Sequence, residues 1–338
     1  MYTENNSLNK YIGNWLFFMF INVSLIIVIG GLTRLTDSGL SITQWQLFSG
    51  IFPPLNLDQW NKYFELYKEI PEYKIQNYSM SLEEFKVIFW WEFIHRLLAR
   101  IFGIFFLIPL LYFTIKLGFK KTKDLFPIFI LICLQGFIGW YMVVSGLTDK
   151  VDVSHYRLSL HLFLAFLIMS LILWNFFKYK KIKVSTKKIS NFFPISFLFL
   201  IFLQIIIGAF VSGMDAGTIY KTWPLMGSSY FPDDNSILNL FSVSIFDDPA
   251  LVQFIHRNLA YLIFCFYLLI AIDVYKNKLS VFVSIVNVIA IILLCQIILG
   301  ILTVLSDAQI ILASMHQIGS ILLITTSLIL VFKNSRIN

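Results

Sequence analysis

The chain has 338 residues, of which 58% are hydrophobic and only 13% are charged, and its mean hydropathy is +0.78. Because soluble domains are about 45–50% apolar and about 25% charged, this composition excludes a soluble enzyme, a disordered chain and a nucleic-acid-binding protein. It is the composition of a polytopic membrane protein. The formal net charge of +7 is therefore informative mainly through its distribution along the chain.

Apolar runs of about 20 residues are typical of transmembrane helices. They predict an all-α integral membrane protein with eight spans, at 14–33, 87–115, 125–146, 156–177, 192–212, 250–274, 280–304 and 309–332. Ser81 and Glu84 have the spacing of a capping box, so the second helix is expected to begin before the membrane. Leu57, Trp60 and Phe64 recur at helical spacing and predict a short amphipathic helix on the outer interface.

The charges predict the orientation of the spans. One side, formed by the N-terminal tail, the connections after the second, fourth and sixth spans and the C-terminus, carries 15 Lys and Arg residues and three acidic residues. Since basic loops stay inside, both termini are expected in the cytoplasm. The Lys runs at 116–123 and 178–188 follow from this topology and need no nucleic acid. The N-terminal tail is not Arg-rich, which argues against a mitochondrial transit peptide and favours a bacterial plasma membrane.

The chain repeats one four-helix unit. Phe93-Ile94-His95-Arg96 recurs in the second half of the chain as Phe254-Ile255-His256-Arg257. Other landmarks recur in the same order: Asp37-x-Gly39 as Asp215-x-Gly217, Trp45 as Trp223, Gln135-x-x-x-Gly139 as Gln296-x-x-x-Gly300, and His161 as His316. We therefore expect two repeated four-helix bundles, residues 1–180 and 181–338, related by an axis along the membrane normal.

Four histidines fall in the spans that run from outside to inside. They are His95, His161, His256 and His316. Each lies about five to eight residues from the start of its span, or about 8–12 Å at 1.5 Å per residue, so all four share one layer near the outer leaflet. Ionisable groups at this depth are costly and mark functional sites. Imidazoles at equal height on diagonally opposed helices can bind the two faces of one haem iron.

Three further side chains adjoin the histidines. Arg96 and Arg257 directly follow His95 and His256; they could pair with haem propionates or simply extend towards the membrane surface. Glu92 lies one helical turn before His95, whereas the equivalent position in the second half is Gln253. A carboxylate beside a haem can move protons or stabilise developing positive charge. This difference indicates one reactive half and one half with a permanent haem.

The motifs resemble those of the haem A synthase family. The segment from Gly30 to Ser41, the sequence Glu92-Phe93-Ile94-His95-Arg96 and the second Phe-Ile-His-Arg carry the resemblance, which extends from about residue 14 to 332 and is nearest to the alphaproteobacterial and mitochondrial branch. It implies an oxidoreductase that converts a ring methyl of haem O to a formyl group, giving haem A for cytochrome aa3-type oxidases. Some members carry a cysteine pair in the outer loops, and this chain has none there.

The resemblance also assigns the residues. His256 and His316, with Arg257, would hold a permanent haem b in the second half. His95 and His161, with Arg96, would hold the substrate haem O in the first half, with Glu92 at the reacting methyl. Haem O synthase and an electron donor are the implied partners.

Two other classes of protein remain open on the sequence alone. Four histidines could hold two low-spin haems in a cytochrome b-type electron carrier, but such a carrier has no need of Glu92. A transporter would have broken helices and a polar site at the midplane, whereas the polar groups of this chain gather towards the outer side.

Overall fold

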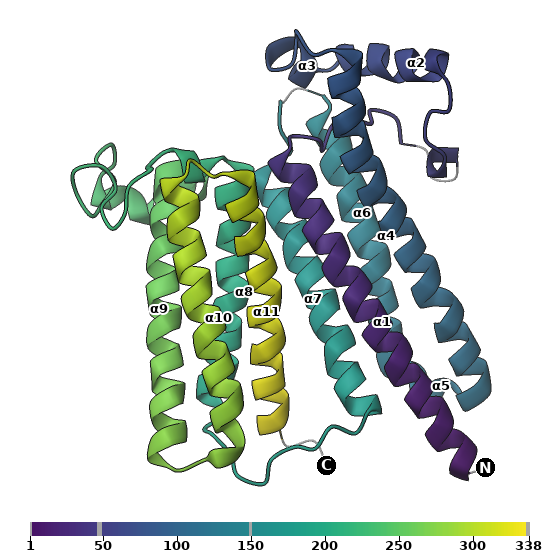
Figure 1. Ribbon diagram of the computed structural model, residues 1–338, viewed down its shortest axis with the longest axis vertical. Coiled ribbons are helices and arrows are strands. Elements are labelled where there is room, and N and C mark those ends of the chain that lie inside the picture. Colours follow the sequence, from purple (N-terminus) through teal and green to yellow (C-terminus); the bar gives the residue numbers. More distant parts are fainter. Residues whose placement is uncertain (1, 46–48, 149–150, 336–338) are drawn as a thin grey trace. The chain divides into compact units, whose positions relative to one another are not determined.

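The computed structural model describes residues 2–45, 49–148 and 151–335. Within these ranges, eight helices are long and apolar enough to cross a membrane (Figure 1). They are α1 (Tyr2–Leu35), α4 (Leu82–Leu117), α6 (Phe126–Gly146), α7 (His155–Tyr179), α8 (Phe192–Gly213), α9 (Pro249–Lys276), α10 (Ser280–Leu305) and α11 (Ile310–Asn334). The eight predicted spans are confirmed; α1 begins well before the predicted start at residue 14, and the other ends shift by a few residues.

The start of α4 is fixed by the predicted capping box. The Ser81 hydroxyl accepts the Glu84 N–H at 3.3 Å, and the Glu84 carboxylate accepts the Ser81 N–H at 2.8 Å. Two of the unpaired N–H groups at the helix start are satisfied in this way. As expected, the helix begins before its apolar stretch.

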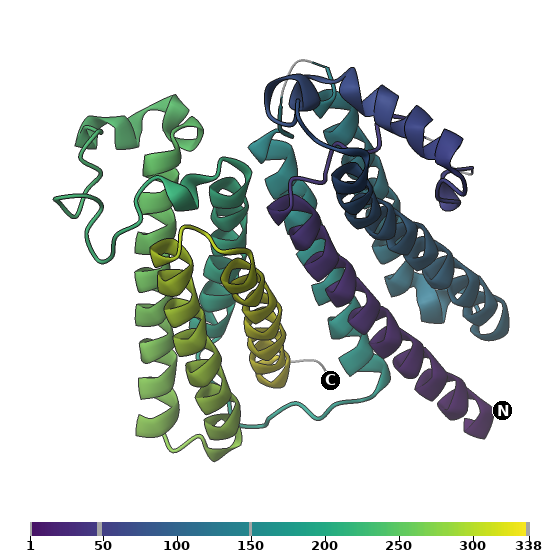
Figure 2. The same ribbon diagram turned by 45° about the horizontal axis from the view of Figure 1, so that its top comes forward.

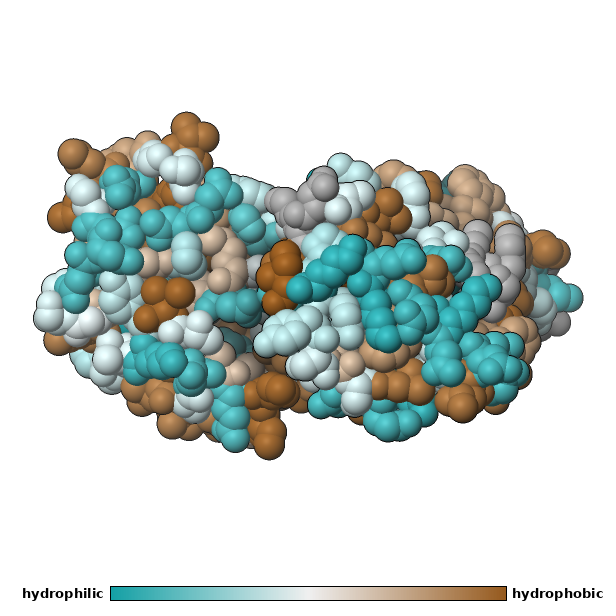
Figure 3. Space-filling model, turned by 90° about the horizontal axis from the view of Figure 1, so that it is seen from above, coloured by the Kyte–Doolittle hydropathy of each residue, from teal (hydrophilic) through white to brown (hydrophobic). Residues whose placement is uncertain are grey.

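The connection between α1 and α4 contains the predicted amphipathic helix. It forms α2 (Leu57–Lys68), followed by α3 (Pro71–Ile75). Phe64 and Tyr67 of α2 are buried, and their rings lie 5.1 and 5.2 Å from the ring of Phe85 at the start of α4. The Tyr67 hydroxyl donates to the Glu72 carboxylate at 2.9 Å, and burial raises the pKa of Glu72 to about 8. Figure 3 shows hydrophilic side chains gathered over this loop-bearing end.

Contacts divide the chain into two compact units, one of Phe18–Ile168 and one of Met1–Phe17 with Met169–Asn338. In the second unit, α8 contacts α9 and α11, and α10 contacts the same two helices. The four helices therefore form a closed bundle in which α9 and α11 face each other diagonally, and Figure 2 shows the four grouped together. This order agrees with the expected repeat. The division of the chain at residue 180 stays a prediction.

In the Phe18–Ile168 unit, α6 lies between α4 and α7. It contacts α4 directly, and its Gly139 lies against the ring of His161 on α7. Thr33 of α1 donates to the main-chain carbonyl of Trp91 on α4 at 3.3 Å. Each histidine-bearing helix of this unit is thus packed against a helix that carries no candidate ligand.

The charge distribution predicts where each connection lies. Reporter fusions placed after α4, α7, α9 and α11 should report the cytoplasm, and fusions after α1, α6, α8 and α10 should report the outer side, because the basic connections stay inside. Alkaline phosphatase and green fluorescent protein fusions give opposite signals and control for expression. An outer location for the segment 178–188 would overturn the orientation.

Candidate functional site

Each of the four predicted histidines lies against a glycine of a neighbouring helix. A Cβ atom added to that glycine would approach the imidazole Cε1 closely: 2.8 Å for Gly30 and His95, 2.9 Å for Gly139 and His161, and 3.1 Å for both Gly208 with His256 and Gly300 with His316. Only glycine permits a main chain to come so near. We call each such glycine, with the histidine ring packed on it, a glycine seat. The chain has four of these seats, two in each half.

Sequence reasoning singled out Gly139 and Gly300 but missed Gly30 and Gly208. The signal was present, because Gly30 and Gly208 are related by the same sequence offset as Asp37 and Asp215.

The rings of His256 and His316 face each other across the second bundle. Their centroids are 6.4 Å apart. Metal–imidazole bonds are about 2 Å long and the ring centroid lies about 1 Å beyond the nitrogen, so two axial imidazoles on one iron have centroids about 6 Å apart. Nδ1 of each of these two rings is buried without a hydrogen-bond partner. A buried polar atom in that state needs a ligand or an ion, and the pair fits a haem iron.

His95 and His161 form the corresponding pair in the Phe18–Ile168 unit. They lie close enough for their charges to interact, and Nδ1 of both rings is again buried without a partner. Gln135 on α6 donates to the main-chain carbonyl of His161 at 3.0 Å. The two pairs of histidines therefore match, because in each pair both Nδ1 atoms are buried and lack a hydrogen-bond partner.

Glu92 is buried, with only 3% of its surface exposed, and its carboxylate is fully engaged. One oxygen accepts the Ser41 hydroxyl and the Ile42 N–H, both at 2.7 Å, and the other pairs with the guanidinium of Arg96. Arg96 also donates to the main-chain carbonyl of Ile42 at 3.1 Å. The carboxylate thus ties the segment after α1 to the helix that carries His95.

In the second half the arginine bond is the same, but the neighbouring side chain bonds in the opposite direction. Gln253 and Arg257 both donate to the main-chain carbonyl of Tyr220, each at 3.0 Å. Tyr220 is related to Ile42 by the same sequence offset that relates Gly208 to Gly30. A neutral donor thus contacts the main chain in the second half, where the carboxyl group of Glu92 accepts hydrogen bonds in the first.

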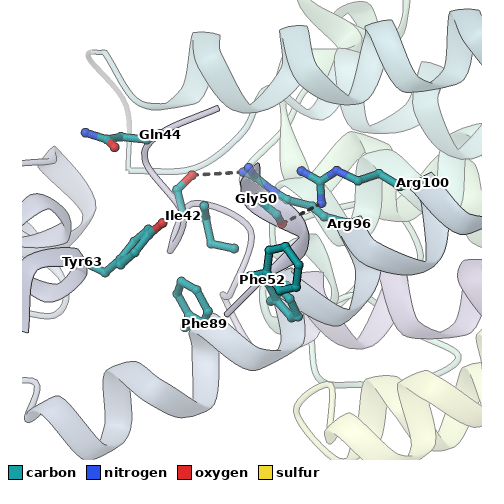
Figure 4. Close-up of a pocket in the computed structure, with 9 residues that line it drawn as sticks. Ile42, Gln44, Gly50, Phe52, Tyr63, Phe89, Arg96 and Arg100 are labelled. Carbon is teal, nitrogen blue, oxygen red and sulfur yellow. Dashed lines mark hydrogen bonds between the residues drawn. The ribbon is translucent and has the colours of Figure 1, made fainter. Parts of the chain in front are cut away.

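A pocket beside the segment that follows α1 is separate from the histidines (Figure 4). Phe52, Tyr63 and Phe89 line it together with Arg96 and Arg100, and no candidate ligand histidine does. The guanidinium of Arg96 lies 5.1 Å from the ring of Trp45, and Arg100 donates to the Gly50 carbonyl at 3.3 Å. Arg96 is thus directed to the outer loop, and its pairing with a propionate stays a prediction.

The glycine seats can be tested with two positions on one helix. In Gly139→Ala, the new methyl group would press on the His161 ring, whereas Gly136 has nothing within 4 Å of an added Cβ. Haem titration of the purified protein should therefore show at least tenfold weaker binding in the first unit for Gly139→Ala, and unchanged binding for Gly136→Ala. Both changes favour the helix by about 1 kcal/mol, so thermal unfolding should not separate them. Equal haem affinity in the two variants would refute the role of the seat.

Comparison with known proteins identifies the family. Residues 13–328 match the COX15-CtaA family model, described as cytochrome oxidase assembly protein. A protein of Pelagibacter ubique (strain HTCC1062) named "Heme A synthase" is 50% identical, over 99% of this chain and 100% of its own length. Proteins of the same name from Wolbachia pipientis wMel and Rickettsia bellii (strain RML369-C) are 42% and 40% identical, each over 94% of this chain and over 91% and 96% of their own lengths. The resemblance of the motifs is thereby confirmed, and the chain belongs to the haem A synthase family.

Proposed function

We propose that this chain oxidises a ring methyl of haem O to a formyl group and so supplies haem A to cytochrome aa3-type oxidases. The observation that carries the proposal is the difference between two otherwise matching histidine sites. Both have two imidazoles seated on glycines, but only the first has a buried carboxylate, Glu92, one helical turn from a ligand. A carrier of two permanent haems would have no use for that difference.

In the second half, His256 and His316 would hold a permanent haem b. The distance between their rings and the unpaired Nδ1 atoms support this assignment. Nε of Arg257 is also buried without a partner, and a guanidinium in that state suits a propionate carboxylate. Bound there, a haem b would supply one-electron transfer. The bundle would fix the positions of His256 and His316 and keep the site apolar.

In the first half, His95 and His161 would hold the iron of haem O as substrate. Each of two hydroxylations of the methyl group would take one oxygen atom from O2 and two electrons from the electron donor, and would release the other oxygen atom as water. Loss of water from the resulting geminal diol gives the formyl group. Glu92 accepts hydrogen bonds from Ser41, Ile42 and Arg96, and each of these bonds favours the charged form of the carboxyl group. In that form it can accept a proton from a hydroxylated methyl or stabilise positive charge that develops on the methyl carbon.

The location follows from the same features. Eight apolar helices make this a multi-pass membrane protein. The histidine-bearing ends of α4 and α9 are tied to the segments that follow α1 and α8, through Ile42 and Tyr220. By the charge distribution these segments lie outside, so both haems would lie near the outer face of a bacterial plasma membrane and both termini in the cytoplasm. Haem O synthase and an electron donor complete the proposed partners.

The assignment of the two halves can be tested by removing single ligands. His256→Ala and His316→Ala should each strip most haem b from the purified protein, because one axial bond is lost. His95→Ala and His161→Ala should leave haem b largely in place and abolish haem A formation. Pyridine haemochrome spectra of protein purified at matched yield measure this. Loss of haem b only in the His95 and His161 variants would reverse the assignment.

The role of Glu92 is tested by Glu92→Gln. An alanine would leave Arg96 without its partner, a loss of about 3–5 kcal/mol for a buried pair, whereas glutamine keeps the shape and much of the hydrogen bonding. Haem A formation in cells that also produce haem O should fall by about 100-fold or more, the usual scale for losing an acid–base or electrostatic group. Mass analysis should show haem O or a hydroxylated product instead.

A second carboxylate serves as the control for this experiment. Glu72 is buried to the same 3% exposure but lies in the outer loop, bonded to Tyr67. Glu72→Gln should retain haem A formation. If Glu92→Gln also gave a normal yield of haem A at matched protein level, Glu92 would have no part in the chemistry.

A further inference from the structure

The connection between α8 and α9 exposes a group of large apolar side chains. It contains two short 3-10 helices, η4 (Ile237–Phe241) and η5 (Val243–Asp247), and residues 236–246 carry no charge. We call its four most exposed apolar residues the apolar patch: Ile237, Leu238, Phe241 and Val243. Phe241 is 85% exposed and Val243 is 98% exposed. Large apolar side chains that gather on an exposed surface mark a site of contact with a protein or a membrane.

Carboxylates flank the apolar patch on both sides in the sequence: Asp233, Asp234, Asp247 and Asp248. Asp233 accepts the N–H of Ser228 at 2.6 Å, and this bond holds the pKa of Asp233 below its usual range, so that its carboxylate is charged. The whole connection, residues 214–248, has one lysine and no arginine. That lysine, Lys221, pairs with Asp307 at 2.6 Å. The surface around the apolar patch is therefore negatively charged.

The connection is fastened to the helix that carries His256. The rings of Tyr230 and Phe231 lie 5.7 and 5.1 Å from the ring of Phe254, two residues before that histidine. The Tyr230 hydroxyl donates to the side chain of Asn258 at 2.6 Å. Figure 1 shows the connection beside the start of α9. A partner on the apolar patch would thus be held at the end of the second bundle where the candidate haem ligand lies.

The flanking charges decide between a protein and a membrane as the partner. Anionic lipids attract basic segments, and segments that lie on a membrane surface carry Lys and Arg on their polar face. This connection has the opposite charge. An apolar centre with a polar rim is the usual arrangement of a protein interface, and a negative rim steers a positively charged protein towards it. The surface therefore fits a small basic protein.

We propose that the apolar patch and its flanking carboxylates form the docking surface for a small basic redox protein that serves as the electron donor. This inference rests on the proposed function, which places a permanent haem b on His256 and His316. In each docking event the metal centre of the donor would be oxidised by one electron and the ferric iron of haem b reduced, with no atom transferred. Two such events match the two electrons that each hydroxylation takes up.

The binding test uses the full chain with haem b bound, in nanodiscs of zwitterionic lipid, and cytochrome c as a small lysine-rich redox protein. Cytochrome c should bind at low ionic strength, and 0.2 M salt should weaken binding at least tenfold, because salt screens exposed charges. Cytochrome c with acetylated lysines should not bind. Asp233→Asn combined with Asp234→Asn should weaken binding at least tenfold, and so should Phe241→Ser combined with Val243→Ser.

A matched control removes two negative charges elsewhere. Asp58 and Glu65 are exposed on α2, and Asp58→Asn combined with Glu65→Gln should leave the binding of cytochrome c unchanged. The inference fails if wild-type protein does not bind cytochrome c at low ionic strength, or if the control weakens binding as much as the Asp233 and Asp234 variant does.

Electron transfer gives a second readout. Haem b reduced with dithionite is mixed with ferric cytochrome c, and its oxidation is followed by stopped-flow absorbance, since one docking surface serves both directions of transfer. The Asp233 and Asp234 variant should react at least tenfold more slowly than wild type at low ionic strength, and at a similar rate at high ionic strength. Equal rates at low ionic strength would refute the docking surface.

Insertion of the apolar patch into the membrane is the competing outcome. A bimane label on Val243→Cys, in a chain whose three native cysteines are replaced by alanine, should not be quenched by brominated lipids. Strong quenching would assign the patch to the membrane and overturn the inference. Failure of the proposed function would look different, because cytochrome c would still bind but the protein would hold no haem b that depends on His256 and His316.

Discussion

The structure depends on placing four imidazoles inside the membrane, where water cannot satisfy their nitrogens. A polar group at that depth has to find its partner in the protein or in a ligand. Here each ring is pressed against the main chain of a neighbouring helix at a glycine, and each retains a buried Nδ1 without a partner. The glycines thus follow from the histidines, because a larger residue would exclude the ring. In the proposed function, a bound haem iron would supply a partner for each pair of rings.

The two halves share one frame around their histidines and differ beside it. Arg96 donates to the carbonyl of Ile42, and Arg257 donates to the carbonyl of the equivalent residue, Tyr220, so this bond is common to both halves. The difference lies beside the first ligand of each pair. The first half has a charged Glu92 where the second has the neutral Gln253.

Much of the fold was predictable from the sequence because it depends on residues that are close together in the chain. Span positions follow from hydropathy, the start of α4 from the spacing of Ser81 and Glu84, and α2 from its apolar period. The four histidines stand out because ionisable groups are rare in spans. The hydrogen bonds from Ser41 and Ile42 to Glu92 were not predictable. They depend on how the segment after α1 passes over α4, which lies about 50 residues later in the chain. The sequence repeat could have identified Gly30 and Gly208, which are equivalent positions in the two halves. Glycine has no functional group, so neither residue stands out as a candidate site residue.

The central claim is that one chain holds a haem that it keeps and a haem that it changes. The most direct measurement is mass analysis of the porphyrins bound to the wild-type protein, purified from cells that also make haem O. The account predicts haem b together with haem A or a hydroxylated form of haem O. Two equivalents of haem b per chain, with no oxidised haem O, would contradict it and would indicate an electron carrier.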